Sequence, residues 1–160
     1  MLSVVLFKPE IPPNTGNIGR LTLGTNSRLI IVGEPSFDLS QDAAVKRAGL
    51  DYWQKVDLKQ YPDWKTYKNN TTGKRFLVTK FAETPYYRAD FAENSHLIFG
   101  GETRGVSEKI HRDPEVTPVC LPMSGEIRSF NVCNTVAVVL FEALRQLNPD
   151  WFSGTPYRKT

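Results

Sequence analysis

The 160-residue chain has an ordinary composition, with 40% apolar and 23% charged residues and a formal net charge of +3. This length allows one domain with a substantial hydrophobic core, and the composition excludes disordered, collagen-like and low-complexity classes. The charge is too small to indicate non-specific duplex binding by itself. We therefore expect a single globular domain over residues 1–160.

The cysteines and histidines form no recognisable metal-binding pattern. Cys120 and Cys133 lie in apolar surroundings, and His96 and His111 have no partners at ligand spacing. We therefore expect reduced core thiols and no metal centre. The sequence contains neither a signal peptide nor an apolar run of ~18 residues, so we expect a cytoplasmic protein that makes no membrane contact.

Short apolar runs alternate with helical patterns from one end of the chain to the other. The apolar, β-branched runs predict strands at residues 4–7, 29–32, 76–79, 97–99 and 119–121. The intervening patterns predict helices at residues 14–25, 41–48, 64–70, 107–111 and 131–147, and a surface loop at residues 85–90. This alternation indicates an α/β fold with a mainly parallel sheet and helices on both faces.

The first predicted helix opens with the segment PPNTGNIGR at residues 12–20. Asn14 is a candidate N-cap. At roughly 100° per residue, Asn14, Asn17 and Arg20 share one polar face, which is able to grip a phosphate or a ribose. The helical pattern alone favours a plainer interpretation, a capped helix with a solvated arginine.

The loop GGETRG at residues 100–105 follows a predicted strand and precedes a predicted helix. It matches neither the dinucleotide-binding fingerprint nor the P-loop pattern. Its glycines would let the backbone approach a ligand, and Glu102 would accept hydrogen bonds from that ligand. Arg104 would contact phosphate or pair with Glu102. Because any tight strand-to-helix turn uses glycine, this loop is a weak indication by itself.

A third polar segment lies before the last predicted helix. Arg128, Ser129, Asn131 and Asn134 gather at its start, where Ser129 or Asn131 would cap the helix. Capping explains one of these groups, so the cluster favours a binding role. Residues 136–141 are apolar on every side of the helix, and we expect burial on all sides, with a second copy of the chain as the outer cover.

Together, these three segments resemble the SpoU-type SPOUT superfamily, most closely the small YibK/TrmL-like tRNA ribose 2′-O-methyltransferases. The matching motifs are residues 14–20, 99–105 and 121–134, and the resemblance covers almost the whole chain. It implies a deep trefoil knot in the C-terminal part, an obligate homodimer and no separate RNA-binding domain. Knots are rare exceptions to ordinary chain topology, and no sequence pattern predicts one.

The resemblance also implies a cofactor and a substrate. S-adenosyl-L-methionine would donate its methyl group to the wobble nucleotide, a cytidine or modified uridine, of a tRNA anticodon stem-loop. The product of the cofactor would be S-adenosyl-L-homocysteine. Catalysis would rest on Arg20 with Asn14 and Asn17, and RNA contacts on Arg20, Arg104 and Arg128. The cofactor would contact Val78, Thr79, Gly100, Glu102, Leu121, Met123, Ser129 and Asn134.

An arginine side chain stays protonated in proteins, so we interpret Arg20 as a fixed cation that stabilises the developing ribose alkoxide. Three alternatives stay open: the same fold methylating another RNA position or base, a non-catalytic RNA-binding protein that binds the cofactor, and a flavodoxin-like nucleotide-binding domain. Aromatic candidates for stacking on unpaired RNA bases are Tyr86, Tyr87, Trp151, Phe152 and Tyr157.

Overall fold

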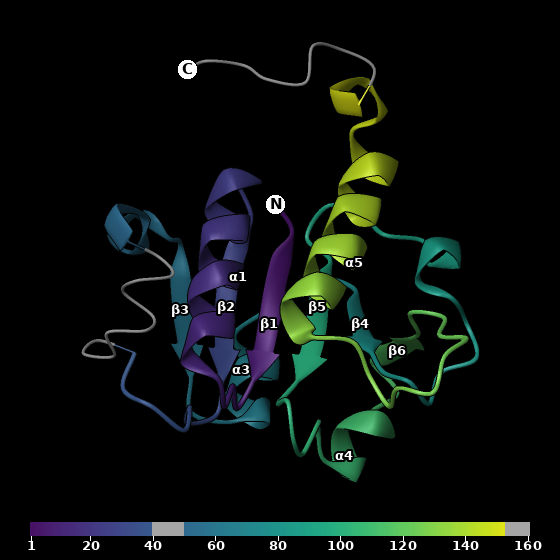
Figure 1. Cartoon of the computed structure of the whole chain (residues 1–160), viewed down its shortest axis with the longest axis horizontal. Helices are drawn as coiled ribbons and strands as arrows, with labels where there is room; N and C mark the ends of the chain where they lie inside the picture. Colours follow the sequence, from purple (N-terminus) through teal and green to yellow (C-terminus); the bar gives the residue numbers. More distant parts are fainter. Residues whose placement is uncertain (40–49, 153–160) are drawn as a thin grey trace.

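A computed structural model describes residues 1–39 and 50–152 of the chain (Figure 1). Within these residues lies a six-stranded sheet in the order β3-β2-β1-β5-β4-β6, and every pair of neighbouring strands is parallel. The predicted parallel α/β architecture is confirmed. The strands are β1 (Ser3–Phe7), β2 (Arg28–Val32), β3 (Leu58–Tyr61), β4 (Arg75–Val78), β5 (His96–Gly100) and β6 (Val116–Val119).

The inner strands follow the predictions, and the two edge strands do not. Each end of β1, β2, β4 and β5 lies within one residue of its expected position. Strand β3 was not predicted, since its sequence LKQY has no apolar run. The prediction of a strand at 119–121 is wrong, because β6 ends at Val119 and contains Pro118. Proline cannot donate a ladder hydrogen bond and is confined to sheet edges, where β6 lies.

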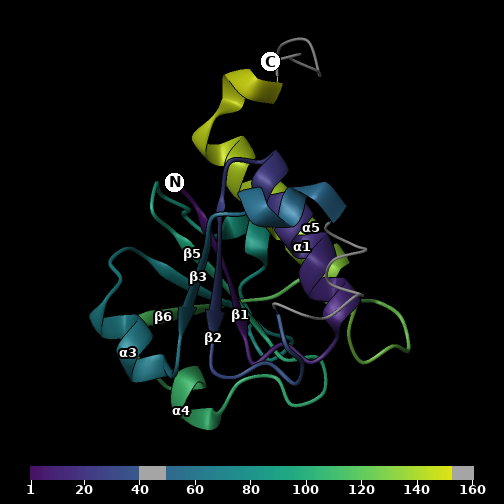
Figure 2. The same cartoon turned by 90° about the vertical axis from the view of Figure 1, so that its left-hand side faces the viewer.

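Helices cover both faces of the sheet, as expected (Figures 1 and 2). Helices α1 (Pro12–Gly24) and α5 (Val132–Leu147) lie side by side on one face. Helices α3 (Trp64–Asn69) and α4 (Glu108–His111) cover the other. The helix predicted at residues 41–48 lies outside the described residues. Short 3-10 helices are η1 (Leu50–Lys55), η2 (Tyr86–Arg88, within the predicted loop) and η3 (Pro149–Phe152).

Alternate side chains of each inner strand enter two separate hydrophobic cores. On β1, Val4 packs with the α1 and α5 side chains, whereas Val5 packs with Tyr67 of α3 and Ile110 of α4. Strands that are buried on both faces need apolar residues at successive positions. This double burial explains why the inner strands are visible in the sequence as continuous apolar runs.

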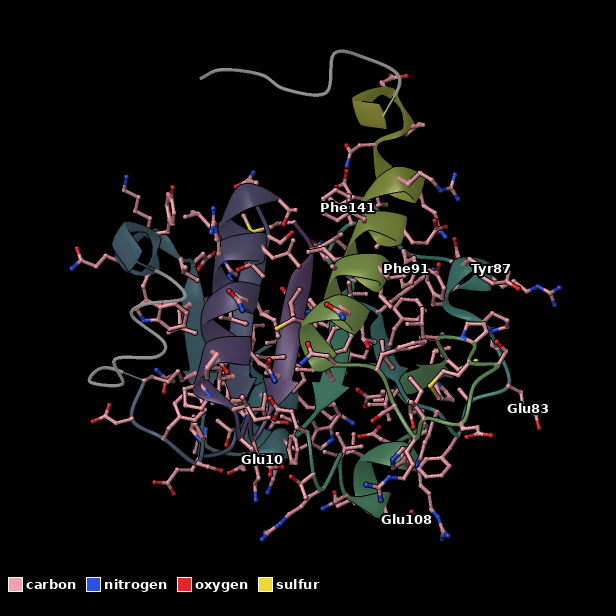
Figure 3. All side chains as sticks on the ribbon, in the orientation of Figure 1. Glu10, Glu83, Tyr87, Phe91, Glu108 and Phe141 are labelled. Carbon is pink, nitrogen blue, oxygen red and sulfur yellow. The ribbon has the colours of Figure 1, made fainter. Side chains whose placement is uncertain are left out.

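Helix α5 has the predicted N-cap, and in the single chain only one of its sides is buried. Asn131 is its N-cap, and the Asn131 side chain accepts a hydrogen bond from the Cys133 backbone N–H. Val139 is fully buried, but Val138 and Phe141 are 40% and 42% exposed (Phe141 is labelled in Figure 3). In the single chain, the core covers only one side of the helix, so burial of the other side by a second copy of the chain stays a prediction.

Candidate functional site

A cavity of about 590 Å³ lies at the carboxyl ends of β4 and β5, next to the segment that precedes α5. Open parallel sheets bind ligands at this edge. The structure therefore brings the second and third polar segments together, as the sequence predicts. Seven of the eight predicted cofactor residues line the cavity, namely Val78, Thr79, Gly100, Glu102, Leu121, Met123 and Ser129. Asn134 does not line it and lies exposed in the first turn of α5.

The predicted catalytic and RNA-contacting residues fall into two groups. Asn14 and Arg104 line the cavity. Asn17, Arg20 and Arg128 are exposed and do not line it. The exposed guanidinium of Arg20 lies 5.5 Å from the centre of the Tyr52 ring of η1. The polar face predicted for the first helix is thus divided between the cavity and the surface.

Asn14 does not cap α1, contrary to prediction. The helix begins at Pro12, and Ile11 is its N-cap without a side-chain hydrogen bond. Proline suits the first turn because its fixed φ is helical and its missing N–H is not needed there. The Asn14 side chain, only 8% exposed, instead donates from Nδ2 to Oε1 of Glu102 at 2.9 Å.

Asn14 connects all three polar segments through its side chain. Its Oδ1 accepts a hydrogen bond from Nδ2 of Asn131 at 3.3 Å, and its backbone oxygen accepts one from the Cys133 thiol, also at 3.3 Å. Residue pairs 88 and 117 positions apart in the sequence thus meet in one network. Burial, followed by the charge of Glu102, raises the pKa of Cys133 to about 11, so the thiol stays protonated at neutral pH.

The loop after β5 is closed by its own backbone and by Glu10, a residue that sequence reasoning missed. Gly101 and Gly105 exchange two backbone hydrogen bonds, at 2.8 and 3.2 Å. A Cβ atom on Gly100 would lie 2.6 Å from the Gly105 backbone, so the loop itself requires glycine there. Glu10 Oε1 accepts from the Thr103 N–H at 3.2 Å, and hydrogen bonding from the Thr103 side chain, followed by its backbone, lowers the pKa of Glu10.

Glu10 also anchors the network through its backbone. Its N–H donates to Oε2 of Glu102 at 2.9 Å, so both carboxylate oxygens of Glu102 accept hydrogen bonds from the protein. The sequence could have indicated Glu10 by its position, since it is a polar residue just after β1, at the sheet edge that holds the cavity (Figure 3). Polar residues that follow a buried parallel strand are therefore candidate site residues.

Residues 1–39 and 50–152 contain no group of three or more His, Cys, Asp or Glu side chains placed to hold a metal ion. Across the same ranges, no helix combines the length and the apolar character needed to cross a bilayer.

Comparison with known proteins gives concordant matches. The SpoU rRNA Methylase family model matches residues 1–141. The chain is 42% identical over 150 residues to the tRNA (cytidine(34)-2'-O)-methyltransferase of Methylovorus glucosotrophus, a match that covers 91% of this chain and 96% of that one. The enzyme of the same name from Photorhabdus asymbiotica is 42% identical over 156 residues, which cover 92% and 94% of the two chains.

A solved structure, described as giving structural insights into the 2-OH methylation of C/U34 on tRNA, has the same fold. It superposes with a TM-score of 0.86 at 36% sequence identity, and the match covers 93% of this chain and 97% of that chain. The sequence resemblance is confirmed, and the chain belongs to the SpoU rRNA methylase family.

Proposed function

We propose that this chain is an S-adenosyl-L-methionine-dependent methyltransferase that methylates the ribose 2′-hydroxyl of the wobble nucleotide, a cytidine or modified uridine, in tRNA. Relatives named for this reaction match more than nine-tenths of the chain. The structural observation that carries the proposal is the contact of Glu102 and Asn131 with Asn14, which draws three segments around one cavity. Family membership removes the flavodoxin-like alternative.

The cavity suits the cofactor in size and chemistry. Its volume of about 590 Å³ falls within the range of small-molecule sites. Val78, Leu121 and Met123 offer apolar surface for an adenine ring, while Thr79 and Ser129 offer hydroxyl groups. When bound, the cofactor supplies an activated methyl group on a sulfonium. We assign its binding to the seven lining residues named above, and the contribution of Asn134 stays a prediction.

The position of Arg20 supports a role toward the substrate. Arg20 is exposed on α1, outside the cavity, and its charge is permanent. In this proposal, Arg20 stabilises the alkoxide that develops as the ribose hydroxyl passes its proton to a substrate phosphate. Asn14 and Asn17 orient the ribose. The exposed guanidinium groups of Arg104 and Arg128 contact phosphates of the anticodon stem-loop.

The test is transfer of a labelled methyl group from the cofactor to tRNA isolated from a strain that lacks this gene. Nuclease digestion should place the label on the 2′-oxygen of the wobble nucleotide. Label on a base or at another position would favour the same fold with a different acceptor. Cofactor binding without any transfer would favour the non-catalytic alternative.

We also propose a homodimer with twofold symmetry that forms across α5. Exposed apolar side chains, Val138 and Phe141, on the outer side of this helix support that interface. Val138→Glu should give a folded monomer, whereas Val139→Glu should unfold the chain because Val139 is fully buried in its own core. Sedimentation equilibrium and circular dichroism distinguish these outcomes. A Val138→Glu variant that still dimerises would place the interface elsewhere.

Finally, we propose that residues 1–160 form one domain with a knotted C-terminal part, and that it acts in the cytoplasm, where tRNA is modified. Cys120 exchanges backbone hydrogen bonds of 2.8 Å with Thr84 and Tyr86, and α5 then returns to contact β5 and η2. The segment after β6 therefore runs past the β4–β5 connection. When both termini are pulled, a knotted chain should stop short of the full extension of about 3.5 Å per residue.

A further inference from the structure

Phe81 is the most exposed large apolar side chain in the described part of the protein, with 75% of its surface accessible. It lies on the rim of the cavity, three residues after β4, and belongs to neither hydrophobic core. Leaving a phenylalanine ring in water forgoes roughly 1.5–3 kcal/mol of burial. Within residues 1–39 and 50–152, neither hydrophobic core accounts for this ring, whereas a partner that covers it does.

The ring is held in position by the turn that carries it. The Phe81 N–H donates to Oγ1 of Thr79 at 3.4 Å, and the Thr79 N–H donates to the Val119 oxygen of β6 at 2.9 Å. The ring meets the His111 ring at 5.9 Å in an edge arrangement, and Nζ of Lys80 lies 5.2 Å from its centre. An aromatic ring that is already positioned loses little conformational entropy when a ligand stacks on it.

The charges around the cavity mouth favour a polyanionic partner. Lys80 and Arg104 supply positive charge among the lining residues. Glu102 is the acidic side chain among them, and both of its oxygens already accept hydrogen bonds from Asn14 and Glu10. Single-stranded nucleic acid combines bases that stack on aromatic rings with phosphates that pair with cations. Exposed polar neighbours on the same turn, among them Lys80 and Glu83, make this ring a poor centre for an apolar protein interface.

We propose that Phe81 is a stacking platform for a base of the substrate RNA, adjacent to the nucleotide whose ribose enters the cavity. Lys80 and Arg104 contact the flanking phosphates. The inference rests on the proposed function, because it takes the methylated RNA as its ligand. Since every base presents an aromatic face, Phe81 contributes affinity and position rather than base identity.

Of the platforms expected from the sequence, Tyr86 and Tyr87 lie away from the cavity. Tyr86 packs against the core beneath α5, and its ring lies 5.5 Å from that of Tyr87. Tyr87 is 50% exposed on η2 and does not line the cavity (Figure 3). Trp151 and Phe152 belong to η3, and Tyr157 lies outside the described residues. Tyr87 is therefore a matched control, an exposed aromatic residue of the same chain at a distinct location.

The experiment measures binding of the full chain to a fluorescent anticodon stem-loop RNA with cytidine at the wobble position. Phe81→Ala should weaken binding, and raise KM for tRNA, by about 5- to 150-fold. Phe81→Trp should retain binding because it keeps a stacking ring. Tyr87→Ala should stay within about twofold of the unchanged chain. Calorimetry should show the same S-adenosyl-L-methionine affinity for all four proteins.

Three results would overturn the inference. The first is unchanged RNA affinity in Phe81→Ala, and the second is an equal loss of cofactor affinity, which would assign the ring to the cofactor pocket. The third is a change of oligomeric state in sedimentation, which would assign Phe81 to a contact between subunits. If the unchanged chain transfers methyl groups to tRNA but Phe81→Ala behaves identically, only this inference fails. If the unchanged chain transfers no methyl groups to tRNA, the proposed function itself is contradicted.

Discussion

Strands β4 and β5 carry a polar cluster at each end, and the two clusters differ in what surrounds them. At the carboxyl ends, Glu102 and Asn14 border a cavity of about 590 Å³. At the amino ends, Arg75 and His96 lie side by side in the sheet and meet Tyr67 of α3 in a closed, buried cluster. One end is open to a ligand, and the other is packed shut.

The closed cluster contains the more strongly shifted titratable groups. The Tyr67 hydroxyl lies 2.7 Å from Nδ1 of His96, whose Nε2 donates to the Thr72 oxygen at 3.1 Å. Burial raises the pKa of Tyr67, while burial and the charge of Arg75 lower the pKa of His96 to about 4. Shifted pKa values often indicate chemistry. In this protein they accompany packing, and the cavity is the better guide to the site.

The largest expected effect separates activity from stability at the open end. Arg20→Ala should lower kcat for methyl transfer roughly 100- to 1,000-fold, because a fixed charge next to the developing alkoxide is lost. Cofactor affinity and the urea midpoint should not change, since Arg20 is exposed and outside the cavity. Arg28→Ala, which removes a pair with Asp57 at the start of β2, is the control and should keep full activity. Loss of cofactor binding in Arg20→Ala would place Arg20 in the pocket instead.

The closed end should respond to acid. The pKa of His96 is about 4 in the folded chain and 6.5 in its ordinary state. Between these values the unfolded chain binds the proton and the folded chain does not, so stability falls as pH drops from 6.5 to 4. The loss should reach about 3 kcal/mol. In urea titrations, the stability of the unchanged chain relative to His96→Gln should shrink across this window; a constant difference would contradict the assignment.

A smaller effect tests the network at the open end. Glu102→Gln keeps one acceptor oxygen where Asn14 and Glu10 need two, so one hydrogen bond is lost. We expect roughly tenfold weaker cofactor binding and a loss of about 2 kcal/mol in unfolding free energy. Calorimetry and urea denaturation measure the two quantities. Glu108→Gln, on the exposed side of α4, should change neither (Figure 3).

The smallest effect concerns the tyrosine of the closed cluster. Tyr67→Phe removes one neutral hydrogen bond to His96 and leaves the ring in place. The unfolding free energy should fall by about 1 kcal/mol, while kcat and KM stay unchanged. A change in KM for tRNA or cofactor would show that the two ends of these strands are coupled. It would contradict the assignment of a purely structural role to the closed cluster.

The success of sequence reasoning depended on whether a strand is inner or edge. Inner strands such as β1 are covered on both faces and must be apolar throughout, so their limits are readable. The edge strands β3 and β6 have mixed sequences, LKQY and VTPV, and were missed or displaced. Their pairing comes from neighbouring strands, a tertiary effect that local patterns do not contain.

The sequence predicted the kinds of polar residues that form the site, but it did not predict the contacts among them. The polar segment before the last helix, with Asn131, stood out because it exceeds what a cap requires. The segments around Asn14 and Glu102 were weak indications by themselves and gained weight from the family resemblance. The hydrogen bonds among them join residues 88 and 117 positions apart, and no local pattern encodes such pairs. Helix periodicity placed Arg20 beside Asn14, whereas packing against the sheet turned only Asn14 inward. The position of Arg20 outside the cavity therefore depends on tertiary contacts.

The bond between Asn14 and Asn131 has a consequence for synthesis of the protein in the cell. The ribosome delivers Asn14 early, and its partner leaves the exit tunnel only after most of the polypeptide has been made. A nascent chain therefore holds the first part of the pocket without the residue that completes it. Products of interrupted translation lack the finished pocket, which confines cofactor capture to chains whose last helix has docked.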